Sequence, residues 1–429
     1  MSELTAPAGA DAPLTIDVTG WRSEAMQRRV ARRYASERRF RAVGLFAVAL
    51  SAGFLAFLLL TMLFNGLRGF TQTEIRLNAD FASISSGVTP AMLQGKGADE
   101  AMARLDLEGL ATSSATAAFG ETGPALLSDG AWLALRDALH DDPSMVTRKA
   151  DIWVPASVAV DSAAKGAGDP EANRQLAALQ AKDRVRTGIS TTFFTASDST
   201  DPTVVGVWGA FKGTLLTMAV TALLAFPVGM LSALYLEEYA PRNRWTDLIE
   251  VSINNLAAVP SIIFGLLGLA VFLNFLNMPR SAPIVGGLTL ALMTMPVIVI
   301  ASRNAIKAVP PSIRDAALAM GASPVQVVFH HVLPLAMPGI LTGTIIGMAR
   351  ALGETAPLIM IGMRAFISSP PSGFTEPATV LPVQIFLWSD EVSRGFVEKT
   401  SAAIIVLLVF LMAMNATAIY LRNHFERRW

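Results

Sequence analysis

The chain has 429 residues, of which 52% are hydrophobic and 16% are charged, and its formal net charge is zero. Soluble domains average about 25% charged residues, so this composition excludes an ordinary soluble protein and indicates an integral membrane protein. The chain has no cysteine, which excludes disulfides and cysteine-ligated metals, and its zero net charge gives no indication of a nucleic-acid partner.

Residues 1–41 form a basic segment in front of an uncharged apolar run at 42–67. Eight arginines lie in the segment, at positions 22, 28, 29, 32, 33, 38, 39 and 41. Because the apolar run is too long for the core of a signal peptide, we expect it to remain in the protein as a first transmembrane helix. The arginines predict that the N-terminus lies in the cytoplasm.

Residues 68–205 are too long and too polar for a linker. EIRLNADF (74–81), ADIWVPASVAV (150–160) and VRTGISTTFFTAS (185–197) are rich in β-branched and aromatic residues, which predicts strands. DEAMARLDLEGL (99–110) and DGAWLALRDALH (129–140) have the apolar spacing of amphipathic helices. We therefore predict an α+β domain outside the cytoplasm, inserted between the first two transmembrane helices.

Five further apolar runs complete a set of six. They lie at 213–236, 251–279, 281–302, about 335–362 and 400–421. A transmembrane helix needs roughly 20 apolar residues, and the alternative that all six are buried helices of a soluble protein is hard to reconcile with their number. Six spans return the C-terminus to the cytoplasm, and this topology places sixteen Lys and Arg residues inside against four in the short outer loops.

The loop at 310–334 predicts a helix–turn–helix elbow. Pro310 and Pro311 stop the preceding helix, Ser312 can cap a new one, and Gly321 can end it in a left-handed conformation. Ser323 then caps a second helix, which Pro334 is expected to end before the membrane. On this prediction two adjacent alanines lie on one side of the first arm, where another protein can approach closely. A plain amphipathic connector lying on the membrane is the alternative.

The fifth run carries two charges one helical turn apart, Arg350 and Glu354, followed by Thr355. Gly339, Gly343 and Gly347 form a stripe of small residues, and at about 100° per residue the two charges fall on the same face. One interpretation is a structural ion pair. The other is an anion path, in which Arg350 supplies forked donors, Glu354 weakens the grip and Thr355 donates a hydroxyl.

Three sequence strings resemble a known family. Asp315-Ala316-Ala317, then Gly321 and Leu333-Pro334, resembles the EAA loop of ABC importer permeases, although Asp replaces the family's Glu and His331 stands where the family has Ile. Ala258–Gly265 (AVPSIIFG) and Gly353–Leu358 (GETAPL) resemble the phosphate-transport permeases of the PstA family, including long forms with an extra outer domain.

The resemblance implies the fold and the roles of several residues. The expected fold is an all-α membrane protein with six transmembrane helices, in which residues 206–429 form a type I ABC importer permease core with five of them. The elbow would dock in a cytoplasmic ATPase through seven residues: Arg314, Asp315, Ala316, Ala317, Gly321, Leu333 and Pro334. An arginine before GETAPL is linked to transport in the family, which favours the anion path for Arg350.

The implied function is that of a permease subunit in an ATP-driven importer of inorganic phosphate in a bacterial inner membrane. The chain has no GxxxxGK[ST] loop, so ATP and Mg would be bound by the ATPase partner, and we expect no cofactor, catalytic residue or metal in this chain. The implied partners are a PstC-like second permease subunit, a PstB-like ATPase dimer and a PstS-like phosphate-binding protein. The alternatives are a permease for another oxyanion, a secondary anion transporter and a membrane-anchored sensor.

Overall fold

The computed structural model describes residues 24–85, 87–94, 97–363 and 366–425, and the chain divides into two compact units, Met1–Thr61 and Met62–Trp429. Helix α1 (Glu24–Gly69) continues without a break for 46 residues through the basic segment and the first apolar run. The ion pairs Glu24–Arg28 and Glu37–Arg41, each four residues apart, support its basic part. Residues 1–23 of the predicted basic segment and the last four residues of the chain lie outside the described residues.

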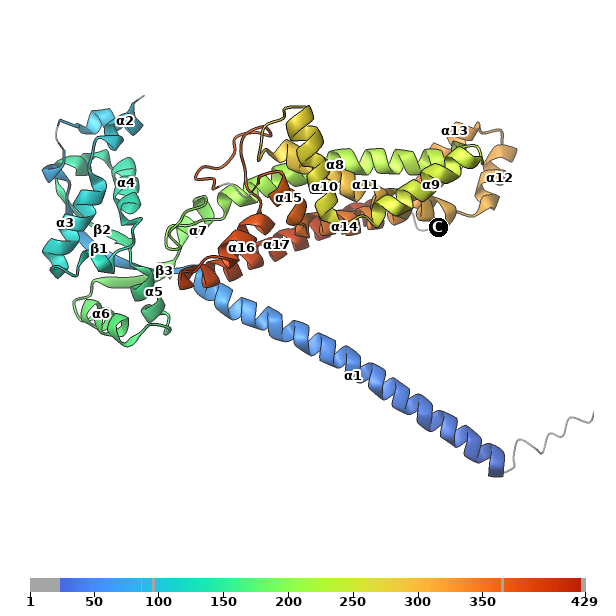
Figure 1. Cartoon of the computed structure of the whole chain (residues 1–429), viewed down its shortest axis with the longest axis horizontal. Coiled ribbons are helices and arrows are strands. Elements are labelled where there is room, and N and C mark those ends of the chain that lie inside the picture. The colour runs from blue at the N-terminus through green and yellow to red at the C-terminus, as the bar shows by residue number, and fades with distance from the viewer. Residues whose placement is uncertain (1–23, 86, 95–96, 364–365, 426–429) are drawn as a thin grey trace, which may run out of the picture. The chain divides into compact units, whose positions relative to one another are not determined.

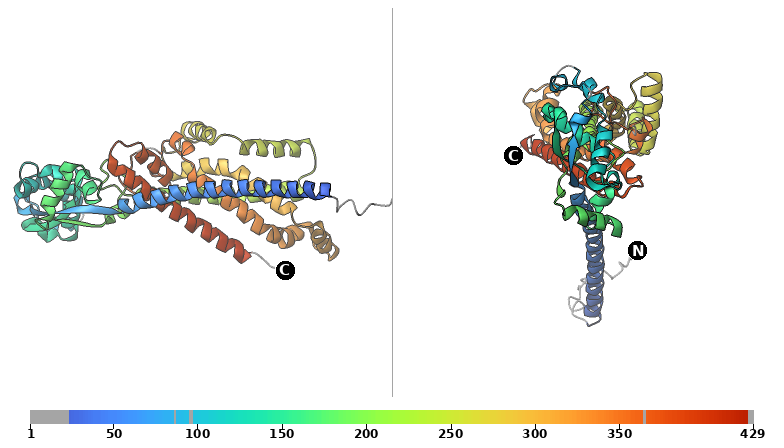
Figure 2. Two further views of the ribbon diagram at one scale, coloured as in Figure 1. Left: turned by 90° about the horizontal axis from the view of Figure 1, so that it is seen from below. Right: turned by 90° about the vertical axis from the view of Figure 1, so that its left-hand side faces the viewer.

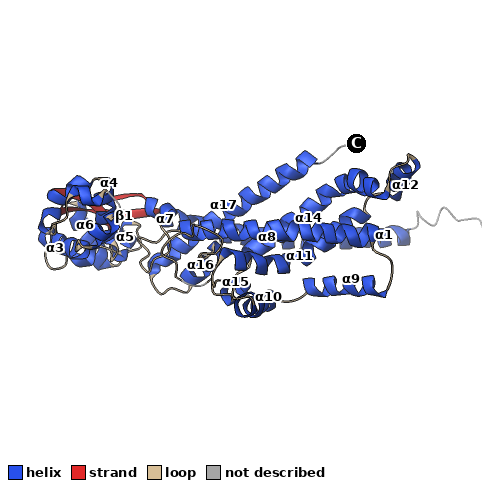
Figure 3. Cartoon of the chain, turned by 90° about the horizontal axis from the view of Figure 1, so that it is seen from above, coloured by secondary structure: helices blue, strands red, loops and turns tan. Residues whose placement is uncertain are grey.

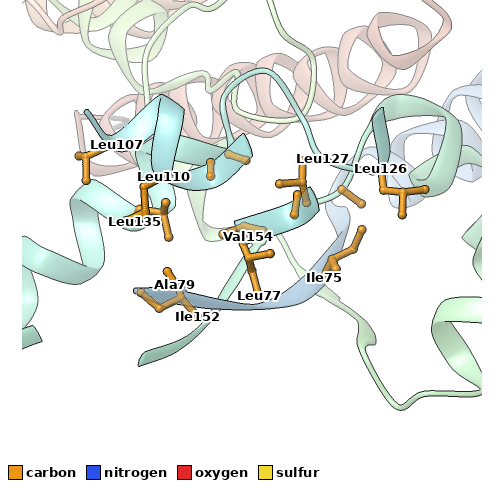
Figure 4. Packing of buried hydrophobic residues seen from close by; sticks show 14 of the residues in the cluster. Ile75, Leu77, Ala79, Leu107, Leu110, Leu126, Leu127, Leu135, Ile152 and Val154 are labelled. Atoms are coloured by element: carbon orange, nitrogen blue, oxygen red, sulfur yellow. The ribbon is translucent and has the colours of Figure 1, made fainter. Parts of the chain in front are cut away.

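The predicted outer domain contains a three-stranded antiparallel sheet. Its strands β1 (Thr71–Asp80), β2 (Lys149–Pro155) and β3 (Val185–Ile189) are arranged in the order β2-β1-β3. Side chains alternate along β1, so that Ile75, Leu77 and Ala79 are fully buried in a cluster with residues from the neighbouring helices (Figure 4). The sheet thus has one apolar face, and the helices of the domain cover it.

The helices of this domain partly differ from prediction. The expected helix at 129–140 is present, but the one at 99–110 is split, because Asp106 caps a new helix by accepting a hydrogen bond from the backbone N–H of Gly109. The predicted strands at 150–160 and 185–197 each end early and continue into a short helix. The α-helices are α2 (Ala98–Ala103), α3 (Leu107–Phe119), α4 (Ala131–Asp141), α5 (Val158–Ala164), α6 (Pro170–Gln180) and α7 (Thr191–Thr195). Short 3₁₀ turns lie at Phe81–Ser83, Pro90–Leu93, Pro124–Leu126 and Pro143–Thr147.

Four long helices run alongside one another in the C-terminal half: α8 (Trp208–Leu234), α11 (Pro283–Lys307), α14 (Leu333–Gly353) and α17 (Arg394–Phe425) (Figures 1 and 2). Small residues bring them close, since a Cβ on Gly287 of α11 would lie 2.4 Å from the Val220 side chain of α8. Five helices of the described chain are long and apolar enough to cross a membrane, and a bent helix pair raises the number to six if it counts as one span.

That bent pair covers the predicted span at 251–279, and the structure adds a break that the apolar run did not indicate. Helices α9 (Arg244–Ala257) and α10 (Ser261–Gly268), the latter continued by a π-helical segment η7 (Leu269–Phe275), meet at an angle of 102° (Figure 3). Pro260 lies between them, and it lacks a backbone N–H and disfavours helical backbone in the residue before it. Asn243 caps α9 by accepting hydrogen bonds from two backbone N–H groups, so the helix also begins earlier than predicted.

The glycine stripe of α14 lies against α11. A Cβ added to Gly339 or Gly343 would meet the side chain of Ala305 or Ala301, at 2.7 Å and 2.2 Å respectively, and one on Gly347 would meet Thr294 at 3.0 Å. Small residues therefore face one another along the whole contact, which allows the two helix backbones to approach closely.

Replacing Gly343 by valine is expected to destabilise the protein by about 1–3 kcal/mol, because the added methyls have no space against Ala301. Gly347→Ala is the matched control, since its single methyl needs only a small shift of the Thr294 side chain. Thermal unfolding of the purified protein measures both. Equal melting temperatures for Gly343→Val and the wild type would contradict this packing.

Buried charges connect the outer domain to the start of α17. Lys165, whose side chain is 5% exposed, places Nζ 2.7 Å from Asp161 Oδ2 and 3.0 Å from Glu398 Oε2. The other oxygen of Asp161 accepts a hydrogen bond from the backbone N–H of Thr73 in β1. The neighbouring Lys399 donates to the carbonyl oxygen of Gly69 at the end of α1, at 2.9 Å. Helix α17 thus contacts the end of α5 and the end of α1 through paired polar groups rather than through apolar packing alone.

Asp198 lies at a second contact, between the segment before α8 and helix α16 (Leu381–Ser389). Its Oδ1 accepts hydrogen bonds from Trp388 Nε1 at 3.0 Å and from Gln384 Nε2 at 3.5 Å. Burial raises the pKa of Asp198 above its usual value, against the lowering effect of these hydrogen bonds. The folded protein therefore favours the neutral form of Asp198. The stability that this form contributes is fully present below the unfolded pKa, and it is lost as the pH rises through the higher pKa of the folded protein.

Asp198→Asn is accordingly expected to raise the melting temperature at neutral pH and to lose this advantage in acid, below the unfolded and the raised folded pKa, where the wild-type carboxyl is also protonated. Asp151→Asn is the control of opposite sign, because hydrogen bonds from Asn78 and Arg76 lower the pKa of Asp151. Its replacement should reduce stability at neutral pH and have less effect in acid. Melting curves of the three proteins across this pH range test the prediction, which fails if Asp198→Asn lowers stability at pH 7.

Candidate functional site

The predicted elbow is present. Helix α12 (Pro311–Ala319) is followed by Gly321 in the left-handed region (φ +86°). Ser323 then caps α13 (Pro324–Gln326) in a reciprocal capping box, in which its side chain accepts from the Gln326 N–H and the Gln326 side chain accepts from the Ser323 N–H. Pro310, not Ser312, occupies the position before α12. The turn is thus formed by local backbone and side-chain chemistry.

Pro334 does not end the second arm, contrary to prediction. A π-helical segment η8 (Val327–Val332) leads from α13 into α14, and Leu333 and Pro334 open that helix. A proline is tolerated in the first turn of a helix because its N–H is not needed there, and the wider π-helical turn precedes it. The elbow is therefore continuous with a transmembrane helix, and Pro324–Gly353 forms a single candidate span of 30 residues.

The two alanines of the elbow face different ways, which corrects the prediction that they share one side. Ala317 is buried in an apolar cluster with residues of α11 and η8, including Ile306 and Val328. Asp315 and Ala316 are exposed, and so are Leu318 and Met320, the latter at 89%. One face of the elbow thus packs against α11 and η8, and the other face is exposed and carries two large apolar side chains.

Arg314 of α12 is turned toward its own chain. Its guanidinium donates to Glu238 Oε1 at 2.7 Å, to the Val309 carbonyl at 2.7 Å and to the Ile306 carbonyl at 3.1 Å. Glu238 and Glu237 lie in a π-helical segment η6 (Tyr235–Tyr239) that ends α8. Sequence reasoning missed both glutamates as partners. The only available signal was two adjacent acidic residues directly after an apolar run, and nothing in the sequence connects them to a residue 76 positions later.

Arg350 and Glu354 lie at a break in the fifth span. Helix α14 ends at Gly353, and Glu354 has extended backbone (φ −83°, ψ 122°), so the two residues do not share one continuous helix as predicted. Arg350 Nε is 3.6 Å from Glu354 Oε1, and their side chains are 49% and 21% exposed. The Arg350 guanidinium donates no hydrogen bond to any residue that the structure describes. The glycine face is occupied by α11, and Arg350 lies at its exposed margin.

A short helix α15 (Ala356–Met360) follows the break. Thr355 is half-buried at its start, and its side chain does not cap that helix. Pro357 and Leu358 are buried, and the Pro357 backbone lies 2.6 Å from where a Cβ on Gly265 of α10 would stand. The GETAPL string therefore packs against the SIIFG string of α10, and this contact brings the two resembling motifs together at the break.

Comparisons with known proteins agree with this arrangement. Residues 27–174 match a domain of unknown function (DUF3333), and residues 225–429 match the family described as binding-protein-dependent transport system inner membrane component. The phosphate transport system permease protein PstA 1 of Mycobacterium tuberculosis is 33% identical over 225 residues, which are 52% of this chain and 72% of the relative. The PstA protein of Haemophilus influenzae is 28% identical over 241 residues, which are 56% of this chain and 83% of the relative.

Solved structures that resemble the chain include ABC importers. An inward-facing form of the MetNI methionine ABC transporter covers 52% of this chain and 98% of its own, at 16% identity and a TM-score of 0.42. The sequence matches confirm the resemblance that the elbow, SIIFG and GETAPL strings predicted, together with a type I ABC importer permease core. The chain belongs to the PstA family of phosphate transport system permease proteins.

Proposed function

We propose that this chain is a permease subunit of an ATP-driven importer of inorganic phosphate. The relatives that it matches over more than 70% of their length are named phosphate permeases. A permease of this family lacks its own ATPase, so the energy must come from another subunit.

The free donors of Arg350 are the observation that carries the proposal. Arg314 and Arg303, two other arginines of the core, are held by carboxylates at 2.7–3.3 Å. Among the residues that the structure describes, the Arg350 guanidinium has one charged contact, Glu354 at 3.6 Å, and it is half exposed at the point where the helix backbone breaks. A planar fork of unused N–H donors fits two oxygens of a phosphate. Glu354 orients the Arg350 guanidinium when no phosphate is bound. Its negative charge also weakens the binding of phosphate, which favours the release of the anion.

The exposed face of the elbow is the proposed contact with the ATPase. Leu318 and Met320 are large apolar side chains at the surface of a short helix, next to the exposed Asp315 and Ala316. Such a face suits a cleft in a partner protein. Gly321 shapes the turn behind it, while Ala317, Leu333 and Pro334 tie the elbow to the core, so these residues support the contact without forming it.

The proposed complex contains a PstC-like second permease subunit, a PstB-like ATPase dimer that binds ATP and Mg, and a PstS-like phosphate-binding protein. The complex as a whole is then a phosphate-importing ATPase that works by alternating access. In the proposed topology both termini lie in the cytoplasm, and residues 68–205 lie in the periplasm of a bacterium with this protein in its inner membrane.

The test is uptake by proteoliposomes that contain the permease, its second subunit and its ATPase, supplied with the binding protein. We expect ATP-dependent entry of labelled phosphate that excess sulfate does not compete away. Strong competition by sulfate would instead support a permease for another oxyanion. Uptake driven by an ion gradient without ATP would support a secondary transporter, and deletion of 312–334 without loss of uptake would exclude coupling through the elbow.

A further inference from the structure

We propose that Arg314 is a positioning residue that latches the elbow to the cytoplasmic ends of α8 and α11, so that these helices move together with the elbow. This inference rests on the proposed function, because it concerns how movement of the ATPase reaches the transmembrane helices. It assigns to Arg314 a role inside the permease in place of the contact with the ATPase that the family resemblance implied.

The contacts of Arg314 connect three elements. Its Nη2 lies 2.7 Å from Glu238 Oε1, at the end of α8, and 3.1 Å from the Ile306 carbonyl of α11. Its Nη1 lies 2.7 Å from the carbonyl of Val309, just after α11 ends. The Ile306 carbonyl also accepts a bond from the backbone N–H of Val309, at 3.2 Å. The C-terminal end of a helix carries a partial negative charge, so a guanidinium there adds a favourable charged donor. Arg314 therefore stabilises the end of α11 while it binds the end of α8.

The two glutamates of η6 form ion pairs with different elements. Glu238 binds the elbow, whereas Glu237 lies 3.3 Å from Arg303 Nε of α11, and the other end of that guanidinium lies 2.9 Å from Glu250 of α9. The glutamate side chains are only 11% and 18% exposed. The end of α8 is thus a branch point, from which ion pairs reach the elbow, α11 and α9.

Apolar packing alone does not fix this geometry. Ala317 of the elbow, Ile306 of α11 and Leu234 of α8 belong to one buried cluster, and such aliphatic contacts are non-directional. A guanidinium with three acceptors permits one arrangement only, because its donors are planar and fixed in direction. The pair is partly buried, with side chains 22% and 11% exposed, so breaking it costs more than losing a pair at the surface. The latch therefore adds directional stiffness to a contact that is otherwise non-directional.

Occupied donors argue against a direct role of Arg314 at the ATPase. Each terminal nitrogen already contacts an acceptor of this chain, and the side chain is 22% exposed. Four of its five N–H groups therefore have acceptors within this chain, which leaves one for a partner. Leu318 and Met320 on the same elbow have no such constraint and are exposed.

The experiment measures the distance between the elbow and α8 in the assembled complex. The chain has no cysteine, so Val325→Cys in the second arm of the elbow and Leu231→Cys in α8 introduce two unique sites for spin labels, both at exposed residues outside the proposed ATPase contact. In the wild-type background we expect a narrow distance distribution whose mean is the same without nucleotide and with ATP. In both Arg314→Lys and Glu238→Gln we expect a broader distance distribution whose mean changes with nucleotide. The lysine variant loses the planar arrangement of donors, and the glutamine variant loses the negative charge.

A coupling measurement accompanies the distances. Phosphate moved per ATP hydrolysed is expected to fall by about 2- to 30-fold in both variants, with the ATPase still bound. Lys307→Ala is the matched control, since Lys307 is half exposed and 3.6 Å from Glu237, and it should change neither readout. If Glu238→Gln does not yield a stable complex, Arg314→Lys keeps the charge and decides the question.

A narrow, nucleotide-independent distribution and an unchanged coupling ratio in both variants would overturn the latch. Loss of ATPase binding in Arg314→Lys, with the label distance unchanged, would show instead that Arg314 contacts the ATPase. The distances do not depend on what is transported. A complex that shows the expected distances but moves no phosphate would therefore retain the latch and refute only the proposed function.

Discussion

Uptake of inorganic phosphate is expected to fall by about 10- to 100-fold when Arg350 is replaced by alanine, because a hydrogen bond to a charged group contributes about 1.5–3 kcal/mol. The guanidinium stands half exposed at the end of α14 and donates to no described residue, so its loss removes donors that the fold itself does not use. Arg350→Lys keeps the charge but loses the fork, and we expect an intermediate rate. Initial rates of labelled phosphate uptake measure all of these variants.

Two further variants separate an anion contact from a structural pair. Glu354→Gln removes the carboxylate that weakens the grip of Arg350, so we expect a lower KM for phosphate with slower turnover. Arg280→Ala, at an exposed arginine outside the long helices, controls for general attraction of anions to the surface. Full activity of both Arg350→Ala and Glu354→Gln would leave only the structural ion pair.

Replacing Lys165 by methionine is expected to destabilise the contact between the outer domain and α17 by about 3–5 kcal/mol, the usual cost of leaving a buried ion pair without one partner. The carboxylates of Asp161 and Glu398 would then face each other without the ammonium that now lies within 2.7–3.0 Å of both. Limited proteolysis near residues 196–206 should become faster, and the melting temperature should fall.

Lys149→Met is the matched control within the same domain. Lys149 is also paired with a carboxylate, Asp80 at 3.1 Å, but both side chains are more than a third exposed to water. Solvent screens such pairs, so this variant should melt within about 1–2 °C of the wild type. A similar fall in melting temperature in the two variants would mean that burial of Lys165 does not strengthen the contact between the outer domain and α17.

Local chemistry explains what could be predicted. Strand β1 was predicted from alternating side chains, and the elbow from a glycine, a serine and prolines whose preferences depend on adjacent residues. Long uncharged runs predicted the transmembrane helices for the same reason, since a helix in lipid satisfies its own backbone groups. Where local signals competed, the prediction missed breaks in the helices: Pro260 lies at the break in the third run, and the break after Gly353 separates Glu354 from the helix of Arg350.

The sequence by itself thus determined the membrane class, the family, the apolar helices and the turn of the elbow, because these depend on neighbouring residues or on resemblance along the chain. Only the tertiary structure decided which charges meet. Arg314 and Glu238 are 76 positions apart, and Lys165 and Glu398 are 233 apart. No local propensity links residues at such separations, and each pair forms only after helix packing has removed its members from water and left one partner within reach.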